Sequence, residues 1–118
     1  MCSDCNYPAL SGVWVAGMYD DIVMQLIHQY KFEHARAAYW PLATYITATL
    51  PFLDESWVVT AIPTIQSHIR ARSFDHAKLL AQEVAQQKHV VFTEALLRKQ
   101  NVQQVGSNRS ERFEQTRL

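Results

Sequence analysis

The sequence predicts an α/β fold, and three segments carry that prediction. Residues 57–62 form a continuous apolar, β-branched run, which is typical of a central strand in a parallel sheet. Residues 74–87 repeat apolar side chains at steps of three and four, the pattern of an amphipathic helix. Residues 90–97 are apolar again and predict a second strand, which Glu94 and Ala95 interrupt. A strand, a helix and another strand in this order begin a βαβ unit.

Two helical segments precede the first strand. Residues 19–32 carry apolar side chains along one face, with acidic residues in the first turn and Lys31 in the last, where the helix dipole favours them. Residues 35–50 predict two short helices or one helix that restarts with Pro41 in its first turn, since proline disrupts a helix interior. The buried side of this segment is expected to consist of Trp40, Leu42, Tyr45, Ile46 and Leu50.

The predicted strand at 57–62 is too apolar to be exposed on either face. We expect helix 19–32 to cover one of its faces and helix 74–87 the other. Ser73 is the predicted N-cap of the latter helix, because its hydroxyl can accept a hydrogen bond from the first turn.

Length and charge limit the classes of protein. A chain of 118 residues that is 48% hydrophobic can bury one core and form one domain. Residues 1–69 carry two cations against six acids, a balance of −4, and residues 70–118 carry nine cations against five acids, a balance of +4. The basic half suggests an anionic ligand but is too weakly charged to imply nucleic acid by itself. No segment reaches the roughly 18 apolar residues of a membrane span and no secretion signal is present, so we expect a cytoplasmic protein.

The only two cysteines, Cys2 and Cys5, have the spacing of a zinc half-site. A structural zinc site needs four ligands, and the sequence has no second Cys-x-x-Cys. His28 and His34 would complete a site only at an unusual spacing. We therefore interpret residues 1–18 as the remnant of a zinc ribbon followed by a linker, in a chain that begins partway through a longer protein.

The segment between the first strand and the next helix is the candidate binding site. Open α/β sheets bind ligands outside the carboxyl ends of their strands, where loop N–H groups and helix N-termini favour anions. Arg70 and Arg72 lie in this predicted loop and keep their charge near neutral pH. The alternative is that both arginines lie on a solvated surface. Further on, residues 98–107 are polar and predict a mobile loop before a short closing helix capped by Asn108.

Several motifs stand in an order that a known family shares. They are Cys2-x-x-Cys5, Lys31-Phe32 at the end of a helix, Ile62-Pro63-Thr64, Arg70-x-Arg72-x-Phe74-Asp75-His76-Ala77, Leu97-Arg98, Gln104-Val105-Gly106, Arg109 and Glu111-Arg112. This order resembles the ComF family of predicted phosphoribosyltransferases, named for a competence protein of bacterial DNA uptake. The resemblance covers nearly the whole chain and implies that residues 19–118 are the N-terminal part of an incomplete type I phosphoribosyltransferase-like fold.

The resemblance implies transfer of a phosphoribosyl group from phosphoribosyl pyrophosphate (PRPP) to an unknown nitrogen nucleophile, with Mg²⁺ bridging the pyrophosphate. It also implies zinc in the parent ribbon and competence-machinery proteins as partners. The residues that it assigns to pyrophosphate binding are Thr64, Arg70 and Arg72. Those that it assigns to a hood loop over the reacting centre are Arg98, Gln104, Arg109 and Arg112.

The sequence departs from this family at three points. Ser73 stands where members usually have glycine, and Gln115 where they often have asparagine. The sequence also lacks the paired acids after a strand and the Thr-Thr-Gly loop that hold the ribose hydroxyls and the 5-phosphate in such enzymes. We therefore expect that this polypeptide neither binds PRPP tightly nor turns it over.

Two other functions are compatible with the sequence. One is a non-catalytic interaction module that binds partners of DNA uptake through the basic half. The other is binding of single-stranded DNA, in which cations attract the backbone and aromatic rings stack on the bases. The residues available for this are Arg98, Lys99, Arg109 and Arg112 with Phe92 and Phe113.

Overall fold

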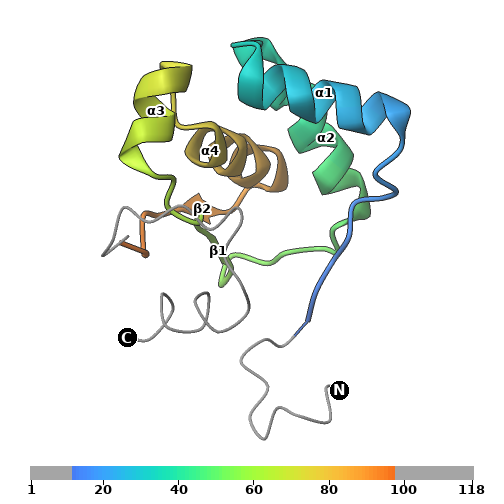
Figure 1. Cartoon of the computed structure of the whole chain (residues 1–118). Helices are drawn as coiled ribbons and strands as arrows, with labels where there is room; N and C mark the ends of the chain where they lie inside the picture. Colours follow the sequence, from blue (N-terminus) through green and yellow to red (C-terminus); the bar gives the residue numbers. More distant parts are fainter. Residues whose placement is uncertain (1–11, 98–118) are drawn as a thin grey trace, which may run out of the picture.

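A computed structural model describes residues 12–97 (Figure 1). The elements in order are α1 (Asp21–Phe32), the 3-10 helix η1 (Arg36–Ala38), α2 (Tyr39–Thr49), β1 (Val58–Val59), α3 (Gln66–Arg72), α4 (His76–Lys88) and β2 (Val91–Phe92). The two strands pair in parallel, with Val58 opposite Val91 and Val59 opposite Phe92. The predicted mixed α/β class is therefore confirmed, but two helices, α3 and α4, separate the strands where the sequence predicted a loop and one helix. No helix within the described range is long and apolar enough to cross a membrane.

The first helices begin where the sequence predicted. Asp20 is the N-cap of α1, and its Oδ1 accepts a hydrogen bond of 3.1 Å from the backbone N–H of Val23. η1 leads directly into α2, which has Pro41 in its first turn. Proline is tolerated there because the first N–H groups of a helix have no intrahelical partner.

The core lies among the helices rather than around the sheet. Tyr30, Ala38 and Leu42 form a buried cluster, against which Phe74 and Leu80 pack. Trp40 and Tyr45, which the sequence predicted to be buried, are instead 58% and 38% exposed. The buried residues of α2 are instead Leu42 and Ala43, which has no exposed surface. α2 packs against α4, on which Ala85 is 2% exposed.

Four side chains form a polar seam between α2 and α4. Thr47 Oγ1 donates a hydrogen bond of 2.9 Å to Gln87 Oε1. Gln87 Nε2 in turn donates to Thr44 Oγ1 at 3.3 Å and to Glu83 Oε1 at 2.9 Å. Both the carbonyl and the amino group of Gln87 are thereby used, so the two helices are joined by directional bonds as well as by apolar packing.

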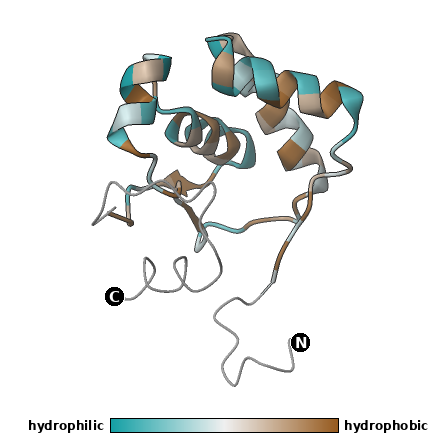
Figure 2. Ribbon diagram, in the orientation of Figure 1, coloured by the Kyte–Doolittle hydropathy of each residue, from teal (hydrophilic) through white to brown (hydrophobic). Residues whose placement is uncertain are grey.

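The sheet is shorter and more exposed than the sequence predicted. α4 contacts both strands, but α1 packs on η1 and α2, so the prediction that α1 covers the second face is wrong (Figure 1). On that face Val58 and Val91 are 52% and 61% exposed, although this part of the chain is hydrophobic (Figure 2). Beyond the paired residues, the N–H of Thr93 donates to the Val59 carbonyl at 3.0 Å and the N–H of Ala95 donates to Thr60 Oγ1 at 3.3 Å.

The connection between α3 and α4 contains a strained residue. Ser73 ends α3 with φ 64° and ψ 5°, the left-handed conformation that favours glycine. The prediction that Ser73 is the N-cap of α4 is wrong, because an N-cap residue needs an extended backbone. Asp75 has that backbone and is the cap.

Replacing Ser73 by glycine is expected to raise the free energy of unfolding by about 1 kcal/mol. The left-handed conformation costs a non-glycine residue roughly 1–2 kcal/mol, and the greater flexibility of glycine in the unfolded chain offsets part of the gain. Urea denaturation would measure the change. Ser67→Gly, at an exposed position inside α3, is the control and should lower stability by about 0.5–1 kcal/mol. A loss of stability in Ser73→Gly would contradict the assigned backbone.

Candidate functional site

A cavity of about 280 Å³ lies at the carboxyl ends of β1 and β2, and we call it the strand-end crevice. Its walls come from the segment after β1, from α3, from the first turn of α4 and from the segment that begins with β2. Parallel strands direct their carboxyl ends to the same edge of a sheet, and this edge is where open α/β proteins bind ligands. Thr64, Asp75, Lys78 and Glu94 are polar lining residues, and Ile69 and Phe92 are apolar ones.

Asp75 is held in the crevice by three hydrogen bonds. Its Oδ1 accepts hydrogen bonds from Thr64 Oγ1 at 2.8 Å and from the backbone N–H groups of Ala77 and Lys78 at 3.1 and 3.2 Å. Within residues 12–97, its Oδ2 has no hydrogen-bond partner. One oxygen of this carboxylate therefore fixes the loop to the helix, while the other keeps its full capacity to accept.

Lys78 and Glu94 form an ion pair across the crevice. Their side chains are 40% and 61% exposed, so the pair contributes little to stability. Together with Asp75, these residues are the charged groups among the described lining residues, and their formal sum is −1. This part of the crevice does not by itself present the positive field that a diphosphate requires.

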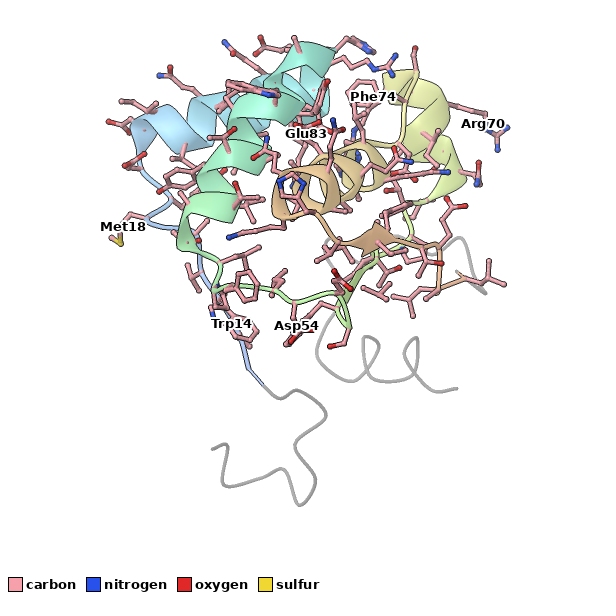
Figure 3. All side chains as sticks on the ribbon, turned by 180° about the vertical axis from the view of Figure 1, so that it is seen from behind. Trp14, Met18, Asp54, Arg70, Phe74 and Glu83 are labelled. Atoms are coloured by element: carbon pink, nitrogen blue, oxygen red, sulfur yellow. The ribbon has the colours of Figure 1, made fainter. Side chains whose placement is uncertain are left out.

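The two arginines predicted to bind pyrophosphate lie on a helix, not on a loop. Arg70 is exposed on α3 and its side chain extends away from the protein (Figure 3). The guanidinium of Arg72 lies 5.4 Å from the centre of the Phe32 ring and donates a 3.0 Å hydrogen bond to His76 Nδ1. Neither arginine lines the strand-end crevice, so of the three residues assigned to pyrophosphate only Thr64 is in its wall.

Arg72 belongs to a cluster that joins α1 to α3 and α4. Burial, with a smaller contribution from Arg72, lowers the pKa of His76 to about 4, so its ring is neutral at pH 7 and Nδ1 accepts from the guanidinium. Burial also raises the pKa of the Tyr30 hydroxyl, which donates a 2.6 Å hydrogen bond to the His76 carbonyl. His34 Nδ1 lies 3.2 Å from the Arg72 carbonyl. These contacts hold helices together.

The remaining predicted site residues lie outside the described part of the chain. They are Cys2, Cys5, Arg98, Gln104, Arg109 and Arg112. Between residues 12 and 97, no group of three or more His, Cys, Asp and Glu side chains is arranged to hold a metal ion. His28, the histidine of α1 that the sequence placed beside the cysteines, has its Nδ1 3.0 Å from Glu33 Oε1.

Three residues of the crevice, Asp75, Lys78 and Glu94, were not predicted as site residues. Glu94 was regarded only as an interruption of a strand, although a carboxylate at the end of an apolar strand is itself a signal for a site. Asp75 directly precedes a helical pattern, which marks it as a cap. Phe92, considered for base stacking, is half-buried in the crevice wall.

Comparisons of the chain with protein-family models, with curated proteins and with solved structures gave no match. The class is therefore defined by the fold and the site alone: a mixed α/β protein with a crevice at the carboxyl ends of two parallel strands.

Proposed function

We propose that this chain is part of a ComF-like phosphoribosyltransferase, in which the strand-end crevice faces the reacting end of PRPP. The observation that carries the proposal is the cavity at the carboxyl ends of two parallel strands, with Thr64 of the Ile-Pro-Thr motif in its wall. The left-handed Ser73 adds support, because it occupies the position where the family usually has glycine.

In this proposal the chain contributes to the pyrophosphate side of the site. The described crevice residues sum to −1, so the cations that neutralise a diphosphate must come from elsewhere. The hood-loop residues Arg98, Arg109 and Arg112 would donate charge-assisted hydrogen bonds to phosphate oxygens, and Gln104 would exclude water with them. Mg²⁺, when bound to the diphosphate, would supply further neutralisation of its charge.

The same proposal holds that the 118-residue polypeptide is inactive by itself. Phosphoribosyl transfer requires the sugar to be held by its 5-phosphate and its hydroxyls, and the sequence has neither a Thr-Thr-Gly loop nor paired acids after a strand. Asp20 and Asp21 do not substitute for these acids, because they lie at the start of α1.

Titration calorimetry with Mg²⁺-PRPP is expected to give a dissociation constant no lower than about 1 mM. The free energy gained from a few solvent-exposed phosphate contacts is only slightly larger than the free-energy cost of the translational and rotational entropy lost on association. Arg70→Ala should leave this value unchanged, as should Arg36→Ala, the control at an exposed position on η1. A dissociation constant below about 10 μM that is lost in Arg70→Ala would contradict the argument.

The family assignment itself is tested by the coding DNA beyond the codon for Leu118. An in-frame continuation to a strand with Asp-Asp and Thr-Thr-Gly would support the phosphoribosyltransferase. A stop codon, with no such segment nearby, would favour the second candidate, an interaction module of the DNA-uptake machinery. The observation in favour of that module is the exposed apolar face of the sheet, on which Val58 and Val91 are 52% and 61% exposed.

A further inference from the structure

We propose that the strand-end crevice binds a small organic amine, with its ammonium group at Asp75 and Glu94 and its apolar part against Ile69 and Phe92. As the acceptor of the phosphoribosyl group, a role that rests on the proposed function, the ammonium ion would first give a proton to a crevice carboxylate, and the neutral amine would then form the bond to C1 of the sugar while pyrophosphate leaves. The binding itself does not rest on that function. The cavity of about 280 Å³ has room for a single ring or a short alkyl chain.

Charge favours a cationic ligand. Asp75 and Glu94 carry two negative charges, and Lys78 neutralises one of them. Among the described lining residues one negative charge therefore remains, and it attracts an ammonium ion and repels an anion.

Hydrogen bonding gives the ligand an orientation. Asp75 Oδ1 already accepts three hydrogen bonds, from Thr64, Ala77 and Lys78. Its Oδ2 has no partner within residues 12–97. The three bonds hold the carboxylate rigid, so an N–H donor that reaches Oδ2 binds without ordering this side chain.

The lining favours an organic cation over a metal ion. A hard divalent cation takes six or more oxygen ligands, whereas the described crevice offers two carboxylates, one of them paired with Lys78. Ile69, Phe92 and Leu96 supply apolar surface that a hydrated metal ion would leave unused. A ring or an alkyl group attached to the ammonium would cover this surface.

Benzylammonium chloride is a suitable probe, and amide chemical shifts in NMR spectra of the full chain would report its binding. We expect a dissociation constant of about 1 mM, with shifts at Thr64, Lys78 and Glu94. Benzyl alcohol has the same shape without the charge and should bind at least about threefold more weakly. Equal binding of the alcohol would overturn the proposal, as would displacement of the amine by an equal concentration of Mg²⁺.

Three variants make the test specific. Asp75→Asn keeps the helix cap, since asparagine caps as well as aspartate, but should weaken amine binding about tenfold. Lys78→Gln should tighten binding about threefold, because it removes the competing cation. Glu55→Gln, on an exposed turn away from the crevice, removes the same net charge as Asp75→Asn and should have no effect. With folding confirmed by circular dichroism, unchanged binding in Asp75→Asn or weaker binding in Lys78→Gln would refute the site.

Discussion

Replacement of Ala43 by aspartate is expected to abolish cooperative folding of the chain. Ala43 has no exposed surface on α2, the helix that packs along α4. A carboxylate there would have neither water nor a cation as a partner, and burying it costs several kcal/mol against a total stability of about 5–15 kcal/mol. Thermal unfolding followed by circular dichroism would show a broad transition in place of a sigmoidal one.

Ala48→Asp is the matched control for this experiment. Ala48 lies on the same helix but is exposed. The same substitution there introduces a negative charge near the C-terminus of α2 and should cost no more than about 1 kcal/mol. If Ala43→Asp unfolded at the same temperature as Ala48→Asp, the contact between α2 and α4 would be wrong.

Tyr30→Ala is expected to lower the free energy of unfolding by about 3–5 kcal/mol. Tyr30 is 2% exposed and lies in the cluster that joins α1 to the other helices. Tyr30→Phe isolates the hydrogen bond to the His76 carbonyl and should cost about 1–2 kcal/mol, because the ring stays in place and only the hydroxyl is lost.

Urea denaturation measures both Tyr30 variants on one scale. Tyr19→Ala serves as the control, since Tyr19 precedes α1 and is 67% exposed; its effect should be within about 0.5 kcal/mol. Tyr30→Ala and Tyr19→Ala giving equal losses would show that α1 is not anchored by this side chain.

The helices were predictable because their signals are local. An acidic residue, Asp21, lies in the first turn of α1 and Pro41 lies in the first turn of α2, as predicted from effects confined to one turn, whereas Asp20 is the N-cap rather than a first-turn residue. Which helix packs on the sheet was not predictable in this way. An apolar helix face can be buried equally well against a sheet or against other helices. α1 packs against the other helices through Tyr30.

In the candidate site too, residues placed by a local pattern were predictable and residues brought together by tertiary packing were not. The rule for open sheets predicts a site at the carboxyl end of the strand, and Thr64, which the family resemblance assigned to pyrophosphate binding, lies there in the crevice wall. The seven residues of α3 resemble a polar loop in sequence because the helix buries only part of one face, which is why Arg70 and Arg72 were expected on a loop. The grouping of Asp75, Lys78 and Glu94 depends on how α4 lies against the strands, which no local pattern encodes.

The polar seam, which consists of Thr44, Thr47, Glu83 and Gln87, allows only one register of α2 along α4. Two helices that touch through alanine have smooth surfaces, and a shift of one turn, about 5.4 Å, would still bury comparable apolar area. The same shift would break both bonds that Gln87 makes to α2, those with Thr47 and Thr44, and would leave only its bond to Glu83 within α4. The seam therefore fixes the register of α2 against α4. It contributes more by disfavouring packings in which the two helices are shifted than by stabilising the native one.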